Sequence, residues 1–129
     1  MADYFWFSVF VFANVLLLTV LGINVSRVRI RERIAHGDGG NVVLKKAIRA
    51  HGNGVEHVMV YALAILALQL VQAPAAWLAT LVCVFTLARV LHAWGMLAVN
   101  FPARRIGAGL TFLLEIVAVF AVLVFGVLA

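Results

Sequence analysis

The chain has 129 residues, of which 66% are hydrophobic and only 12% are charged. A soluble globular domain is nearer one half apolar, so this composition excludes a soluble protein and indicates an integral membrane protein. The formal net charge of +5 would also suit nucleic-acid binding, but basic residues that flank apolar segments more often report membrane orientation. The single cysteine, Cys83, excludes an intrachain disulfide, and nothing in the sequence suggests a zinc site.

Four apolar segments follow one another along the chain, and each approaches the ~20 residues needed to span the hydrocarbon of a bilayer. Because only a helix satisfies its own backbone hydrogen bonds in lipid, we expect a single all-α domain, a transmembrane four-helix bundle. The expected helices cover about residues 4–26, 42–71, 75–99 and 106–128. The first is expected to stay in the mature chain, because no basic region precedes it as one would in a signal peptide.

Basic residues gather at the first and third connections between these segments, whereas the second connection and both termini carry none. Those in or beside the first linker are Arg27, Arg29, Arg31, Arg33, Lys45, Lys46 and Arg49. The third connection carries Arg104 and Arg105. The positive-inside rule therefore predicts that both basic connections face the cytoplasm and that both termini lie outside.

The stretch "RAHGNGVEH" opens the second apolar segment with a concentration of polar groups. Arg49, Asn53 and Glu56 are spaced i, i+4 and i+7, so on a helix they form one stripe, while His51 and His57 project elsewhere. With a rise of ~1.5 Å per residue, Glu56 is expected roughly 7 Å inside the cytoplasmic boundary. Ionisable residues inside a membrane are costly, which favours ligand binding over the alternative, an interfacial stripe of snorkelling side chains.

A second constellation, "ARVLHAWGM", places Arg89, His92 and Met96 on one face of the third segment. Arg89 is expected ~10 Å from the cytoplasmic boundary, and Glu115 in the fourth segment at a similar depth. We therefore expect Arg89 and Glu115 to form a buried ion pair, which could order the bundle or take part in catalysis, with a structural role favoured for Glu115. A hydrogen bond to a neighbouring helix is the alternative role for His92.

The remaining features of the sequence have simpler interpretations. The alternating arginines of "RVRIRER" determine topology and contact lipid headgroups, with ligand binding by one of them as the alternative. Cys83 lies in an apolar segment and is expected to fill space. No glycine cluster has the spacing of a P-loop, so the sequence predicts no nucleotide site.

Three motifs carry a resemblance to a known family. "RAHGNGVEH" resembles the second-helix signature Arg-x-His-x-Asn-x-x-Glu of the MAPEG superfamily, the membrane-associated proteins in eicosanoid and glutathione metabolism. "ARVLHAWGM" and "PARRIG" resemble its third helix and third linker, and "GDGGNVVLKKAIRAHGN" is similar to its bacterial members. The resemblance covers nearly the whole chain. It implies a homotrimer in a bacterial inner membrane that binds glutathione, a co-substrate, between adjacent subunits near the cytoplasmic face.

The resemblance also implies roles for particular residues. Those that match the family's glutathione-contacting and binding-site positions are Arg49, Asn53, Glu56, Arg89 and His92. Either Arg27 or Arg29 matches an arginine that reaches the ligand of a neighbouring subunit. Arg104, or Arg105 if the alignment slips by one residue, matches the arginine that stabilises the glutathione thiolate.

One position departs from the family's pattern. Several mammalian members have a tyrosine where this chain has Met96, and methionine cannot donate a hydrogen bond to a thiolate. Thiolate formation would then rest on arginine alone. The expected function is a glutathione-dependent membrane transferase or peroxidase that acts on lipophilic electrophiles from the bilayer, as in detoxification. The alternative is a non-catalytic membrane protein that binds a lipid or thiol, or a small subunit of a larger complex.

Overall fold

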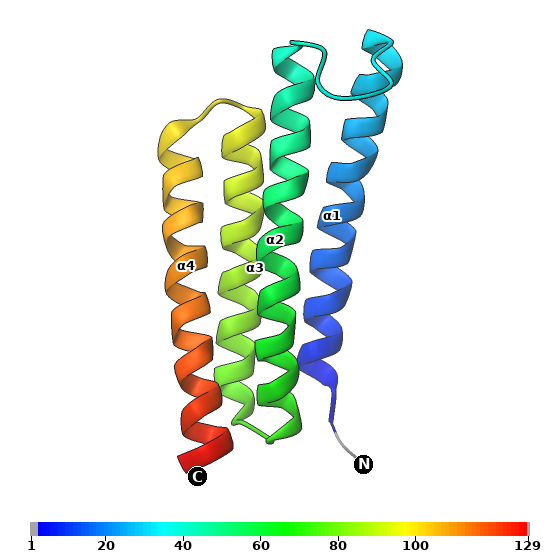
Figure 1. The fold of residues 1–129 in the computed structure, drawn as a ribbon. Helices are drawn as coiled ribbons and strands as arrows, with labels where there is room; N and C mark the ends of the chain where they lie inside the picture. The colour runs from blue at the N-terminus through cyan, green and yellow to red at the C-terminus, as the bar shows by residue number, and fades with distance from the viewer. Residues whose placement is uncertain (1–2, 129) are drawn as a thin grey trace.

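Four long helices, described over residues 3–128 of a computed structural model, lie side by side in an up-and-down bundle (Figure 1). They are α1 (Phe5–Glu32), α2 (Val42–Leu70), α3 (Ala75–Leu97) and α4 (Phe101–Leu123), and a π-helical turn, η1 (Val124–Leu128), continues α4. No strand occurs in the described residues, so the all-α prediction is confirmed. All four helices are long and apolar enough to cross a membrane.

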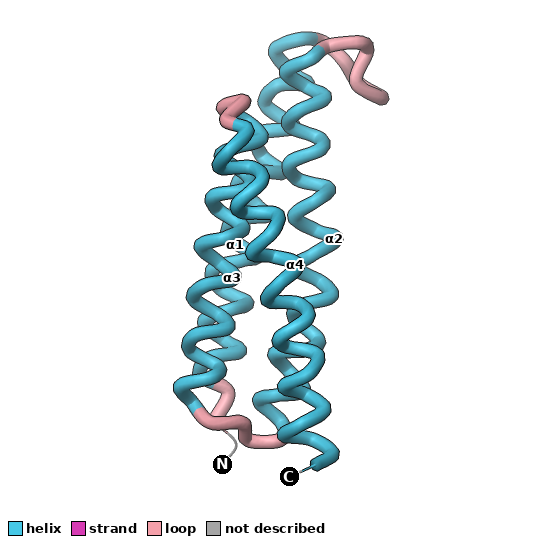
Figure 2. Tube along the Cα trace, turned by 90° about the vertical axis from the view of Figure 1, so that its left-hand side faces the viewer, coloured by secondary structure: helices cyan, strands magenta, loops and turns pink. Residues whose placement is uncertain are grey.

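The α1–α2 linker and the α3–α4 connection lie at one end of the bundle, which we call the linker end (Figure 1 and Figure 2). The α2–α3 turn lies at the other end, where the described part of the chain also begins and ends. Nine of the ten lysines and arginines therefore gather at the linker end, and the exception is Arg89. In both views α1 and α2 extend beyond the α3–α4 connection, so the linker end is stepped.

Two helices extend further than their apolar segments. α1 continues through a basic segment to Glu32, and Arg33 ends it in the left-handed conformation with φ 58°. α4 begins at Phe101, where the side chain of Asn100 accepts a hydrogen bond from the Ala103 backbone N–H at 3.0 Å. Arginine and glutamate are good helix formers, and asparagine is a favoured N-cap, so these ends follow local chemistry rather than the limit of the lipid.

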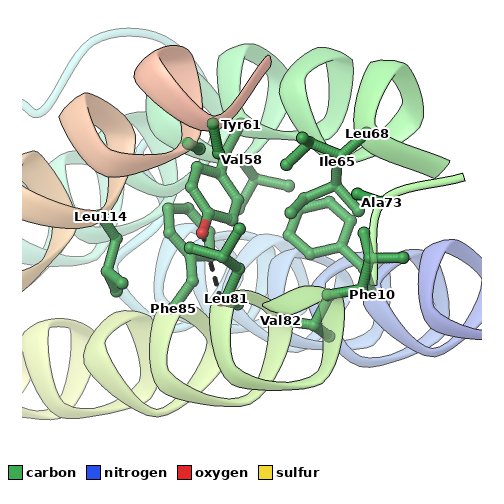
Figure 3. Close-up of a cluster of buried hydrophobic side chains, with 13 residues drawn as sticks. Phe10, Val58, Tyr61, Ile65, Leu68, Ala73, Leu81, Val82, Phe85 and Leu114 are labelled. Carbon is green, nitrogen blue, oxygen red and sulfur yellow. Dashed lines mark hydrogen bonds between the residues drawn. The ribbon is translucent and has the colours of Figure 1, made fainter. Parts of the chain in front are cut away.

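A cluster of buried hydrophobic side chains, three of them aromatic, packs between the helices (Figure 3). The rings of Tyr61 and Phe85 stack with centroids 3.8 Å apart, and Phe10 of α1 lies 5.8 Å from both. The Tyr61 hydroxyl donates a hydrogen bond to the Leu81 carbonyl at 3.2 Å, so its one polar group is satisfied within the core. The same cluster includes Leu114, Ala118 and Ala121 of α4, so it joins all four helices.

Glycines bring α3 and α4 into close contact near the linker end. A Cβ atom at Gly95 would overlap the backbone of Arg104, and one at Gly107 would lie 2.7 Å from the backbone nitrogen of His92. Real Cβ atoms do not approach neighbours so closely, so only glycine permits this packing. The backbone of Arg104 is thereby held against the last turn of α3.

Candidate functional site

A cavity of about 260 Å³ opens at the step of the linker end, among α2, the end of α3 and the start of α4. We call it the linker-end cavity. Its cationic lining residues are Lys45, Lys46, Arg49 and Arg104, and the others are Val42, Gly95, Met96, Val99 and Phe101. None of these described lining residues is acidic. The cavity therefore suits a small anionic ligand.

The register of α2 explains why three of these cations share one cavity. Asn41 caps the helix, its side chain accepting a hydrogen bond from the Leu44 backbone N–H at 2.9 Å. With the helix starting there, Lys45, Lys46 and Arg49 fall on one face of its first two turns. The cap therefore fixes which way the cationic face points.

The cavity brings together three of the residues singled out in the sequence. Arg49 comes from α2, Met96 from α3 and Arg104 from α4. Arg105 is exposed and is not among the described residues that line the cavity. Of the two alternative arginines, Arg104 is therefore the one beside Met96.

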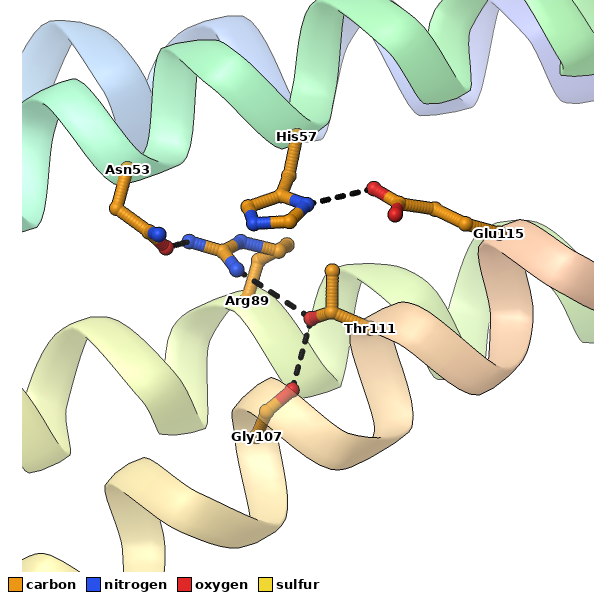
Figure 4. A network of polar contacts seen from close by, with 6 residues as sticks. All are labelled: Asn53, His57, Arg89, Gly107, Thr111 and Glu115. Atoms are coloured by element: carbon orange, nitrogen blue, oxygen red, sulfur yellow. Dashed lines mark hydrogen bonds and ion pairs between the residues drawn. The ribbon is translucent and has the colours of Figure 1, made fainter.

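A polar network includes Asn53, which lies one turn of α2 beyond Arg49 (Figure 4). The guanidinium of Arg89, which is only 2% exposed, donates hydrogen bonds to Asn53 Oδ1 at 2.7 Å and to Thr111 Oγ1 at 3.3 Å. Thr111 in turn donates to the Gly107 carbonyl at 2.7 Å. Arginine has only donors, so it turns the Asn53 oxygen inward and leaves the amide N–H groups to face away. Arg89 is thus placed to orient Asn53.

The prediction that Arg89 and Glu115 form an ion pair is wrong. Glu115 instead contacts His57, with 2.7 Å between its Oε1 and the imidazole Nδ1 (Figure 4). Equal depth along two helices does not fix the direction in which each side chain points. Thr111 takes the place opposite Arg89, while Glu115 faces α2.

His57 is the member of this network that the sequence argument missed. It was expected only to project away from the stripe of Arg49, Asn53 and Glu56, and it does so toward α4. Its ring also meets Phe112 edge-on, with centroids 5.1 Å apart. The sequence could have suggested this contact, because His57 and Glu115 each lie in an apolar segment and each needs a polar partner in lipid.

Two other candidate residues lie apart from the cavity lining. His92 is buried, packs against Gly107, and neither ring nitrogen has a hydrogen-bond partner among the described residues. It lies one helical turn before Met96, so it is beneath the cavity rather than in its wall. Glu56 is exposed on the surface of the single chain.

The two alternative arginines of α1 also differ in their surroundings. Arg29 donates hydrogen bonds to the carbonyl groups of Gly37 at 2.7 Å and Ile34 at 3.4 Å, so it holds the linker. Arg27 lines a second cavity, among α1, α2 and the last turn of α3. Neither lines the linker-end cavity within this chain.

Comparison with known proteins identifies relatives of the chain. The model of the MAPEG family matches residues 7–125. The chain is 34% identical over 99 residues to "Inner membrane protein YecN" of Escherichia coli, a match that covers 76% of this chain and 75% of that protein. YecN from a second Escherichia coli strain matches with the same identity and coverage. No solved structure matches the chain.

Proposed function

This chain belongs to the MAPEG family, and we propose on that basis that it is a glutathione-dependent membrane transferase or peroxidase acting on lipophilic electrophiles. The observation that carries the proposal is the linker-end cavity, where Lys45, Lys46, Arg49 and Arg104 surround one space. Glutathione has two carboxylates, and guanidinium and ammonium groups bind carboxylates through charge-assisted hydrogen bonds. The linker end then faces the cytoplasm, where glutathione is available.

Arg104 is assigned to the thiol. A guanidinium beside a thiol favours the thiolate, which is the nucleophile. The thiolate attacks the electrophilic atom, a bond from sulfur forms, and the leaving group departs with its electron pair. Met96, Val99 and Phe101 give the same cavity an apolar wall against which a lipophilic electrophile can pack.

The ammonium of glutathione needs a carboxylate that the cavity of one chain does not supply among its described lining residues. Glu56 is an exposed carboxylate on α2, available to a cleft shared with a second subunit. We therefore include assembly as a homotrimer in the proposal, with Glu56 binding the ammonium at a subunit boundary.

Met96 favours a second candidate function. Its thioether cannot donate a hydrogen bond to sulfur, so only Arg104 would stabilise a thiolate in this cavity. The same cationic side chains would also serve a protein that binds glutathione, another thiol or a lipid without turnover.

The test is a calorimetric glutathione titration of the purified protein in detergent, followed by conjugation of chlorodinitrobenzene. Saturable binding with turnover supports the enzyme, and saturable binding alone supports the non-catalytic candidate. The matched control is Arg33→Ala, which removes a linker-end arginine that does not line the cavity and should leave binding unchanged. Absence of binding by the wild-type protein would refute both glutathione proposals.

A further inference from the structure

A second cavity, of about 240 Å³, lies at the linker end among α1, α2 and the last turn of α3. Its lining includes three cations, Arg27, Arg31 and Lys46. Arg31 is paired with Glu32, with 2.7 Å between Arg31 Nε and Glu32 Oε1. In the described structure neither Arg27 nor Lys46 forms an ion pair with a carboxylate. Two cationic side chains therefore remain available to an anion in this cavity.

The position of the cavity along α1 indicates its depth in the membrane. Asn24, another lining residue, belongs to the last turn of the apolar part of α1, which ends at Val25, and Arg27 follows two residues later. The end of an apolar transmembrane segment lies where the hydrocarbon gives way to headgroups. The cations of this cavity are therefore at the level of lipid phosphates, whichever way the protein faces.

The rest of the lining is apolar. Val28, Val43 and Leu97 come from three different helices and form one wall beside the cations. A free phosphate ion would gain nothing from such a wall. The glycerol backbone and first methylene groups of a phospholipid would bury apolar surface there.

We propose that this cavity binds the phosphate headgroup of an anionic phospholipid. The phosphate oxygens accept hydrogen bonds from the Arg27 guanidinium, the Lys46 ammonium and the Asn24 amide, and the apolar wall holds the glycerol region. Basic pockets between transmembrane helices commonly bind anionic lipid headgroups. This site is separate from the linker-end cavity, since the two share only Lys46 among their lining residues.

The shared lysine couples the two cavities, a consequence that rests on the proposed glutathione site. One ammonium cannot fully neutralise a phosphate on one side and a carboxylate on the other. Anionic lipid should therefore weaken glutathione binding, on the order of fivefold, a value near the lower end of measured coupling between sites.

The primary test does not involve glutathione. Native mass spectrometry would count the lipids retained by protein released from nanodiscs of phosphatidylcholine mixed with phosphatidylglycerol. The wild-type protein should retain phosphatidylglycerol selectively, Arg27→Gln should lose it, and the matched control Arg33→Gln should retain it, since Arg33 does not line this cavity. Equal retention of the two lipids by the wild type, or undiminished retention by Arg27→Gln, would overturn the proposal. Displacement of the lipid by millimolar inorganic phosphate would overturn the lipid assignment in favour of a free-phosphate site.

A second measurement examines the coupling. Glutathione affinity should be lower in nanodiscs that contain phosphatidylglycerol than in phosphatidylcholine alone, and Arg27→Gln should remove that difference. Equal wild-type affinity in both membranes would disprove the coupling through Lys46. If the wild type binds no glutathione in either membrane, the proposed function fails, and the lipid count still decides the second cavity.

Discussion

Arg49 lines the linker-end cavity from α2. In the proposed function its guanidinium pairs with a carboxylate of glutathione. Arg49→Ala should weaken glutathione binding by ~1.5–3 kcal/mol, the range for a lost hydrogen bond to a charged group. Calorimetric titration measures the change, and size-exclusion chromatography checks that the oligomer is retained. Wild-type affinity in a correctly assembled variant would make Arg49 a snorkelling residue at the membrane surface.

A substitution at Asn53 can distinguish a role in glutathione binding from a role in the stability of the fold. In Asn53→Asp, a carboxylate replaces the amide oxygen that accepts from Arg89, so the buried contact becomes an ion pair and the melting temperature should not fall. The substitution also removes the amide donors and adds a negative charge, so glutathione affinity should fall about tenfold. Thermal unfolding in detergent and titration measure the two effects. A lower melting temperature with unchanged affinity would show that Asn53 only supports the fold.

Arg104 and Arg105 make a matched pair for the thiol. The pKa of a free thiol is near ~8.5, and an adjacent guanidinium lowers it because the thiolate is favoured. The pKa of the bound glutathione thiol should therefore be depressed in the wild type and in Arg105→Ala, and should return toward the free value in Arg104→Ala. Ultraviolet absorbance of the thiolate against pH measures it. A bound thiol that titrates like free glutathione in all three proteins would end the case for arginine activation.

The contact between α3 and α4 determines where Arg104 lies. Gly95→Ala would force the new methyl group against the Arg104 backbone, so both stability in detergent and glutathione affinity should fall. Gly109→Ala is the control on α4, because a Cβ there meets nothing within 4 Å. That change should raise stability by about 0.5–1 kcal/mol, since alanine is the better helix former. Equal melting temperatures for the two variants would contradict the role given to Gly95.

At the level of whole helices, the sequence was sufficient to predict the fold class. Each apolar run became a helix because lipid leaves the backbone no other way to satisfy its hydrogen bonds. The ends at Glu32 and Phe101 were not predicted, because hydropathy reports where lipid stops and not where a helix stops. The sequence also did not show in which direction around its helix each side chain points. For that reason Glu115 was predicted to pair with Arg89, whereas it contacts His57.

The candidate site was predicted only in part, and for the same reason. Helical spacing correctly placed Arg49 and Asn53 on successive turns of α2, but it could not tell that one lines a cavity while the other faces Arg89. Lys45 and Lys46 were read only as topology signals, since their convergence with Arg104 depends on how α2 packs against α4. Contacts between helices are set by tertiary packing, which local spacing does not contain.

For the whole molecule, Glu56 bears on assembly. It is an exposed side chain within an apolar, membrane-spanning helix, and a carboxylate facing lipid is costly. A second subunit that covers it would remove that cost. If that assembly is the proposed homotrimer, native mass spectrometry in mild detergent should give one species with three times the 14.0 kDa chain mass. A monomer that binds glutathione as tightly as the protein does in the membrane would contradict assembly through Glu56.

The linker-end cavity lies beside the α3–α4 connection, and Val99 and Phe101 add apolar side chains to its cationic lining. In the proposed reaction the protein works as a phase-transfer catalyst, because a water-soluble nucleophile and an oil-soluble electrophile meet only at the boundary between bilayer and water. The rate of turnover then depends on the mole fraction of electrophile in the membrane and not on its bulk concentration in the sample. Adding vesicles without protein would dilute the electrophile within the membrane and slow the reaction, although the amounts of protein, glutathione and electrophile stay the same.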